Sequence, residues 1–280
     1  MINLRFFLIF FSVCILLISC QKRKAAAVFV KPEIEAAKSE EKKNKVEDPN
    51  GIVPALYYIP ILNVKRLNCQ GQRKESIKNI RGQTLAEVCE SDYKTCIDQG
   101  ACLLNEKGGL RMINFAARRG KAPLFSDKIK KECPFGLGMK DICLDPYYTV
   151  AGDLNFHKLG DVIFIPSVRG VALPNGETHD GYFVVRDSGV NLKSGARFDF
   201  FTGFDDIKDE GNVFRRLGLD NKENRFRFEK VSGEYATQVR VKHNYPKLNK
   251  KRLREASKVL KKSMTEAPMS LSQPENDIFW

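Results

Sequence analysis

Three aspartates in the middle of the chain accompany short segments of strand-forming residues. Asp153 ends the segment 149–153, Asp187 ends the segment 182–187, and Asp199 lies within the segment 197–201. Strand propensity is high in Tyr182–Val185 and in Val162–Ile165, which lies between the first two acids, because valine, isoleucine, phenylalanine and tyrosine favour strands. We therefore predict a small barrel of strands that brings the three carboxyls towards one place. Carboxyls gathered in this way can act as general acids and bases.

The motifs around these acids resemble a known family. Thr149-Val150-Ala151-Gly152-Asp153, Leu159-Gly160, Asp187-Ser188-Gly189 and Phe198-Asp199-Phe200 occur in the order of the motifs of the three-aspartate domain. That domain is a double-psi β-barrel found in membrane-bound lytic transglycosylase A and its relatives. The similarity covers about 55 residues. The chain departs from the family pattern at Val190, where a second glycine is usual, and at Lys158, where a proline is usual.

The resemblance implies a fold and an activity. The fold class would be mainly β: a double-psi β-barrel with a disulfide-stapled N-terminal subregion and a basic C-terminal helix. The activity would be that of a peptidoglycan lytic transglycosylase, which cleaves the MurNAc–GlcNAc bond and closes a 1,6-anhydro ring without water. One carboxyl donates a proton to the glycosidic oxygen and later accepts one from the C6 hydroxyl. Such a carboxyl needs a pKa above the usual value of about 3.9.

The same resemblance assigns roles to the three aspartates. Asp199 occupies the position of the catalytic acid, and Asp187 and Asp153 would be the neighbouring carboxyls. If 197–201 is a strand, Phe198 and Phe200 point away from the Asp199 side chain. The alternative interpretation is structural, with an Asp-x-Gly turn at Asp187 and a capped loop at Asp153.

Substrate-binding residues are expected on either side of these acids. The candidates are Tyr147, Tyr148, Thr149, Ser188 and Gly189. Adjacent tyrosines can form one wall of a sugar groove, and packing at the barrel rim is the alternative. No metal site and no cofactor are expected, since His157, His179 and His243 are scattered along the sequence.

Six cysteines lie between residues 69 and 143 and include no Cys-x-x-Cys pair. We predict that most or all of them form disulfides, which fits an exported protein. Six cysteines allow fifteen pairings, and the sequence does not choose among them. The candidates are Cys69, Cys89, Cys96, Cys102, Cys133 and Cys143.

The N-terminus has the proportions of a signal peptide. Arg5 precedes the apolar run Phe6–Ile18, and Leu17-Ile18-Ser19-Cys20 resembles the lipobox of bacterial lipoproteins. An uncleaved anchor helix is the alternative. We expect lipidation at Cys20 and, because Gln21-Lys22 follows it, a place on the periplasmic side of the outer membrane.

The predicted organisation has four parts. They are a lipoprotein signal peptide (1–19), a flexible tether (20–52), a double-psi barrel domain with a Cys-rich insertion (53–245, three-aspartate core 147–204), and a basic helix with a loose tail (246–280). We also predict strands over 56–64, 225–228 and 235–241, and a basic helix over 247–262.

The formal net charge is +13, and about +12 remains without residues 1–19 because Arg5 is the one charged residue there. A basic exported protein can meet acidic lipid, nucleic acid or the carboxylates of stem peptides. The expected partners are peptidoglycan strands and, through Cys20, the membrane. Nucleic acid is not expected, and the protein is expected to be a monomer.

Two other functions stay open: a non-catalytic peptidoglycan-binding lipoprotein, and a hydrolase of another β-linked polysaccharide that uses two aspartates.

Overall fold

The computed structural model describes residues 51–65, 67–128, 130–189 and 192–265. The signal peptide, Cys20, almost all of the tether, Val190 and the tail after 265 lie outside these residues. Their assignments stay predictions. None of the helices among the described residues is long and apolar enough to cross a membrane.

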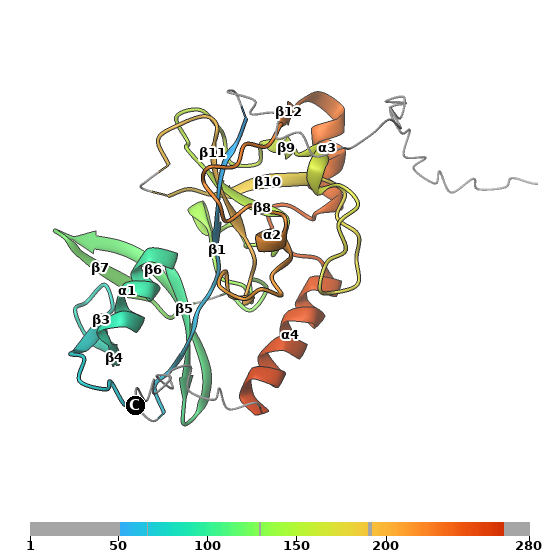
Figure 1. Cartoon of the computed structure of the whole chain (residues 1–280). Helices are drawn as coiled ribbons and strands as arrows, with labels where there is room; N and C mark the ends of the chain where they lie inside the picture. The colour runs from blue at the N-terminus through green and yellow to red at the C-terminus, as the bar shows by residue number, and fades with distance from the viewer. Residues whose placement is uncertain (1–50, 66, 129, 190–191, 266–280) are drawn as a thin grey trace, which may run out of the picture. The chain divides into compact units, whose positions relative to one another are not determined.

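The described part of the chain is mixed α/β with more strand than helix, and its strands form three sheets (Figure 1). The largest has six strands in the order β1 (Val53–Tyr57), β11 (Arg197–Phe201), β8 (Thr149–Gly152), β10 (Tyr182–Asp187), β9 (Val162–Phe164) and β12 (Glu229–Val231). The predicted excess of strand is confirmed. The order runs from β1 at one edge to β12 at the other, so ladder pairing alone does not define a closed barrel.

Two smaller sheets are formed between β1 and β8 in the sequence. A four-stranded sheet has the order β2 (Ile61–Asn63), β5 (Ala101–Glu106), β6 (Gly109–Arg119) and β7 (Ala122–Ser126). A two-stranded sheet pairs β3 (Lys74–Lys78) with β4 (Thr84–Cys89). The helices are α1 (Glu90–Gln99), α2 (Val213–Arg216), α3 (Gly233–Lys242) and α4 (Lys250–Thr265), with short 3-10 turns at Met139–Asp141 and Pro166–Val168.

The predicted first strand over 56–64 was wrong, because it is two strands in two sheets. β1 ends at Tyr57 and β2 begins at Ile61, directly after Pro60. Proline has no N–H group to donate to a ladder. β1 pairs with β11, whereas β2 pairs with β5, so the residues between them carry the chain from the six-stranded to the four-stranded sheet.

The two predicted strands near the C-terminus were also wrong. Residues 235–241 lie within helix α3, where Ala236 and Val239 are buried three residues apart and pack on the β9–β10 side of the sheet. Residues 225–228 contribute a single bridge, from Phe226 to Ile52. The strand of this region is β12, a few residues later.

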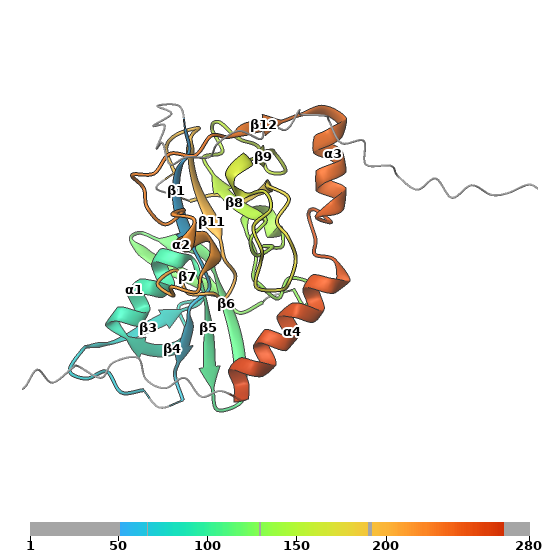
Figure 2. The same cartoon turned by 45° about the vertical axis from the view of Figure 1, so that its right-hand side comes forward.

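The six-stranded sheet has a different apolar cluster on each face. Phe198 and Phe200 of β11 belong to a core with Val150, Phe183 and Phe214. Phe201 belongs to a second cluster. That second cluster joins residues of β5 with Leu248 and Ala256 of the C-terminal segment. The predicted basic helix is α4, which packs against β6 in the same region (Figure 2).

All six predicted cysteines are paired. The disulfides join Cys69 to Cys89, Cys96 to Cys102, and Cys133 to Cys143. The first two lie around the two-stranded sheet and α1. The third closes the loop that leads into β8.

Candidate active site

Asp187 and Asp199 lie on either side of one small residue in the centre of the six-stranded sheet. Ala151 of β8 is paired with Asp187 of β10 and with Asp199 of β11. Paired residues of neighbouring strands project their side chains to the same face. Because adjacent strands are about 4.8 Å apart, the two aspartate Cα atoms are separated by roughly 10 Å across the strand between them. Two of the three predicted acids are therefore brought together.

A bulge in β10 brings Asp187 into this row. Val185 pairs with Val150, and the next pairing skips Arg186 and joins Asp187 to Ala151. An extra residue in a strand re-aims the side chains that follow it. The Arg186 guanidinium is fully buried and donates hydrogen bonds to the backbone oxygens of Cys143 (2.9 Å) and His243 (2.9 Å). These bonds supply the buried guanidinium with acceptors and fix the bulge.

Asp199 lies on the face of β11 opposite to Phe198 and Phe200. Arg197, two residues earlier and so on the same face, places its Nε 3.1 Å from Asp199 Oδ1. Burial raises the pKa of Asp199, and Arg197 opposes that rise. On the other side, Asp199 is paired with Ala55 of β1. The residues paired with Asp199 on both neighbouring strands are therefore alanines, which have the smallest side chains after glycine.

Asp187 is the more strongly perturbed of the two acids. Burial raises its pKa to about 7, and the charge of Asp199 acts in the same direction. The backbone N–H groups of Ser188 (2.9 Å) and Met139 donate to its carboxylate and oppose that rise. The buried Tyr57 hydroxyl also favours the carboxylate form, although it makes no hydrogen bond of ordinary geometry. A carboxyl with a pKa near 7 can exchange a proton at neutral pH.

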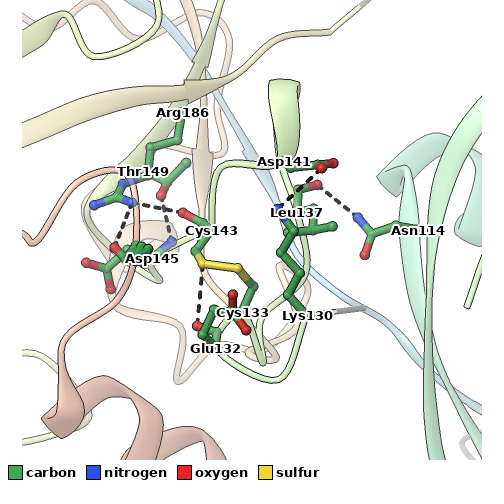
Figure 3. Close-up of a disulfide and its surroundings, with 11 residues drawn as sticks. Asn114, Lys130, Glu132, Cys133, Leu137, Asp141, Cys143, Asp145, Thr149 and Arg186 are labelled. Atoms are coloured by element: carbon green, nitrogen blue, oxygen red, sulfur yellow. Dashed lines mark hydrogen bonds and ion pairs between the residues drawn. A yellow bond between two sulfur atoms is a disulfide. The ribbon is translucent and has the colours of Figure 1, made fainter. Parts of the chain in front are cut away.

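Figure 3 shows the loop closed by the Cys133–Cys143 disulfide. This loop supports Asp187. Asn114 of β6 donates to the Leu137 carbonyl oxygen at 2.9 Å. A Cβ atom on Gly138 would lie 2.3 Å from the Arg186 carbonyl oxygen, so only glycine fits against β10 there. The next residue, Met139, supplies the N–H group that reaches Asp187. The disulfide loop is therefore part of the site.

The third predicted acid, Asp153, follows the end of β8 and makes local hydrogen bonds. Its Oδ1 accepts from the Asn155 backbone N–H at 2.9 Å and from Asn155 Nδ2 at 2.8 Å. This is the geometry of an Asx turn. The structural interpretation of Asp153, as a residue that caps a loop, has direct support in these contacts.

The predicted substrate-binding residues have different environments. Tyr148 is buried, with its ring 4.6 Å from that of His179 and 4.4 Å from that of His243. Thr149 is fully buried and accepts a hydrogen bond from the Asp145 N–H at 2.8 Å. Ser188 contributes its N–H to Asp187. Gly189 follows at the end of the described segment, and Tyr147 lines a pocket.

That pocket has a volume of about 520 Å³. It lies between the residues that follow β11 and the helix α4. Phe135, Tyr147 and Phe204 supply aromatic surface. The Tyr147 hydroxyl donates to the Asp205 carboxylate, and burial raises the pKa of Asp205. The basic residues of the lining all come from α4: Lys251, Arg252, Arg254 and Lys258.

Several residues of the site were not predicted. Tyr57 and Met139 interact with Asp187, and Arg197 pairs with Asp199. Arg186 forms the bulge directly before Asp187. The position of Arg197 two residues before Asp199 in a strand was a usable signal, because such residues share a face. The other contacts depend on the bulge and on the disulfide pairing. Among the described residues, no group of three or more metal-ligating side chains is gathered in one place.

Comparison with known proteins gives structural matches and no sequence matches. No family model matches the sequence, and no curated protein matches it. A membrane-bound lytic murein transglycosylase from Agrobacterium tumefaciens matches with 16% identity and a TM-score of 0.48, over 69% of this chain and 76% of that one. E. coli MltA with bound chitohexaose matches with 13% identity and a TM-score of 0.45, over 64% and 70%. LtgG of Burkholderia pseudomallei matches with 16% identity and a TM-score of 0.35, over 65% and 72%. The chain thus bears a structural resemblance to lytic transglycosylases of the MltA type.

Proposed function

We propose that the protein is a peptidoglycan lytic transglycosylase with Asp199 as its acid/base. The observation that carries the proposal is the pair of partly buried carboxyls, Asp187 and Asp199, on either side of Ala151. The sequence motifs around both acids support it independently, because they resemble those of the three-aspartate domain.

The proposed reaction uses one carboxyl twice. Protonated Asp199 donates its proton to the glycosidic oxygen, and the bond from that oxygen to C1 of the MurNAc residue breaks. Asp199, now a carboxylate, accepts the proton of the C6 hydroxyl while O6 bonds to C1 and closes the 1,6-anhydro ring. The site ends with its proton restored, and no water is consumed. The charge of Asp199 raises the pKa of Asp187, so a proton is held at the pair near neutral pH.

The proposal includes a double-psi barrel for the six-stranded sheet. Two parallel pairs, β1 with β11 and β8 with β10, occur among antiparallel ones. The bridge between Ile52 and Phe226 connects the residue before β1 with the segment just before β12. These are the two edges of the sheet, so this bridge supports closure.

The proposal also includes a lipid anchor at Cys20 and action from the periplasmic side of the outer membrane. The lipobox-like Leu17-Ile18-Ser19-Cys20 supports the anchor. The three disulfides support an oxidising compartment.

A non-catalytic glycan-binding protein is the second candidate, favoured by the ion pair between Arg197 and Asp199. A guanidinium at 3.1 Å favours the carboxylate form, which cannot donate a proton. Catalysis therefore requires substrate to displace Arg197 from Asp199.

The two candidates are separated by digesting purified peptidoglycan with the full-length protein and analysing the soluble products by mass spectrometry. Anhydromuropeptides are the expected products. Products heavier by one water would show hydrolysis instead. Sedimentation of the protein with the wall, without release of fragments, would show a binding protein.

A further inference from the structure

The pocket beside α4 is separate from the two central carboxyls, and it has a charged wall. Lys251, Arg254, Glu255 and Lys258 line it. Their spacing of three, four and seven residues places them on one face of the helix. Including Arg252 and Asp205, the lining holds four basic and two acidic side chains. The pocket is therefore net positive.

Two of the basic side chains are used to hold α4 in place. Arg252 is buried and lies 3.0 Å from Asp145, 2.9 Å from Glu177 and 2.7 Å from Glu255. Lys251 forms an ion pair with Glu177. Asn175 donates to Glu255 at 3.3 Å. These contacts fix the helix against the loops that precede β8 and β10.

The other two basic side chains have no such role. Arg254 and Lys258 are exposed, and neither forms an ion pair with a described residue. They are four residues apart on the helix, where like charges repel each other. The two acids of the lining are already engaged, Glu255 by Arg252 and Asp205 by the Tyr147 hydroxyl. An anionic group placed between Arg254 and Lys258 would remove this repulsion.

The pocket lies along the same strand as the proposed catalytic acid. Thr202, Gly203 and Asp205 of its lining come directly after β11, and Asp199 is three residues before Thr202. At about 3.3 Å per residue, the pocket begins roughly 10 Å from Asp199 along the chain. A short substituent on a sugar bound at Asp199 can span that distance.

We infer that this pocket binds the peptide substituent of the glycan strand, with its carboxylates on Arg254 and Lys258 and its apolar side chains on Phe135, Tyr147 and Phe204. The inference rests on the proposed function, because it takes the glycan at Asp199 as given. The ligand class is an anionic peptide with small apolar side chains. Aromatic and proline surface beside paired cations fits such a group better than a bare sugar, whose lactyl group offers a carboxylate close to the ring but no apolar side chain.

The test compares the double variant Arg254→Gln/Lys258→Gln with wild type on two substrates. One is peptidoglycan with its stem peptides, and the other is the same glycan after an amidase has removed them. The control variant Lys78→Gln/Arg81→Gln removes one lysine and one arginine from exposed positions around the two-stranded sheet. We expect KM on the peptide-bearing substrate to rise roughly threefold to thirtyfold in the pocket variant alone. KM on the stripped glycan should be unchanged in both variants. An equal KM for wild type and the pocket variant on the peptide-bearing substrate would overturn the inference.

A binding measurement separates failure of this inference from failure of the proposed function. A soluble disaccharide tetrapeptide is titrated into each full-length protein in a calorimeter, beside the disaccharide without peptide. Peptide-dependent binding that is lost in the pocket variant supports the inference even if no preparation cleaves glycan. Absence of peptide-dependent binding in wild type overturns it. The inference would also be overturned if the pocket variant lost only its affinity for vesicles of anionic phospholipid. Arg254 and Lys258 would then be membrane-binding residues.

Discussion

Asp187 and Asp199 are both paired with Ala151, one from each neighbouring strand of the six-stranded sheet. This arrangement gives the two carboxyls one methyl group between them and a common face. It also depends on the bulge at Arg186, because a regular strand would put Arg186 in that position. The geometry of the site is thus set by one extra residue in β10, whose guanidinium is held by the backbone oxygens of Cys143 and His243.

The size of Ala151 should control access to the acids. Ala151→Val adds two methyl groups between the carboxyls in a strand that tolerates β-branched residues. Ala151 is buried, so we expect overpacking to cost about 1–3 kcal/mol of stability. We expect kcat/KM to fall by roughly a hundredfold, since small displacements at a reacting centre have effects of that size. Val150→Ile is the control, because Val150 faces the core on the other side of the sheet. An equal loss of activity in both variants would show that the size of the Ala151 side chain has no special role.

The pKa of Asp187 predicts a pH-dependent cost in stability. The folded protein holds the proton up to a pKa of about 7, whereas the unfolded chain loses it near pH 4. Stability therefore falls as the pH rises through this window, and the full cost is present above pH 7. Asp187→Asn removes the ionisation. We expect the variant to be more stable than wild type by a few kcal/mol at pH 8 and equal to it near pH 4, measured by urea unfolding. A difference that does not depend on pH would contradict the burial of this carboxyl.

The Tyr57 hydroxyl should lower the pKa of Asp187. Removing it by Tyr57→Phe is expected to move that pKa upwards, as followed by NMR of labelled aspartate carboxyl carbons. The loss of stability should be small, below about 1 kcal/mol, because the hydroxyl makes no ordinary hydrogen bond. Tyr58→Phe is the matched control, since the Tyr58 hydroxyl interacts with Asp206 instead. A pKa of Asp187 that stays constant in Tyr57→Phe would show that the Tyr57 hydroxyl does not influence Asp187.

The Cys133–Cys143 disulfide should affect activity as well as stability. Cys133→Ser/Cys143→Ser and Cys69→Ser/Cys89→Ser each open a short loop, and each should lose about 3 kcal/mol of unfolding free energy. Only the first variant frees the loop in which Gly138 packs on Arg186 and Met139 donates to Asp187. We expect kcat/KM to fall at least about tenfold in that variant alone, assayed well below its unfolding temperature. Equal activities in the two variants would show that the loop does not position the acid.

The central strands could be predicted from the sequence, because their apolar runs are short, rich in β-branched and aromatic residues, and lie beside or contain an aspartate or a glycine. The pairing of all six cysteines followed from their number and the expected export. The predicted strand over 56–64 failed because the apolar run continues through Pro60, although the chain changes sheet there. The predicted strand over 235–241 failed because the two buried residues, Ala236 and Val239, are three positions apart, which is the spacing of one face of a helix.

The details of the site could not be predicted in the same way. Nothing local marks Arg186 as a bulge, since its burial depends on carbonyl groups of Cys143 and His243 that are distant in sequence. The contact of Met139 with Asp187 depends on which cysteines pair. The basic helix was predicted, but the pocket beside it needs the loop after β11, which only the fold brings near.

The most direct test of the account is the product analysis of the full-length Asp199→Asn variant beside wild type on purified peptidoglycan. Asparagine keeps the shape of the side chain and cannot donate a proton as an acid. We predict 1,6-anhydromuropeptides from wild type and a loss of at least about a thousandfold in their rate of release from the variant. The variant should unfold at a similar temperature and still sediment with the wall. Release of anhydromuropeptides by Asp199→Asn at the wild-type rate would contradict the assignment of Asp199 as the acid/base.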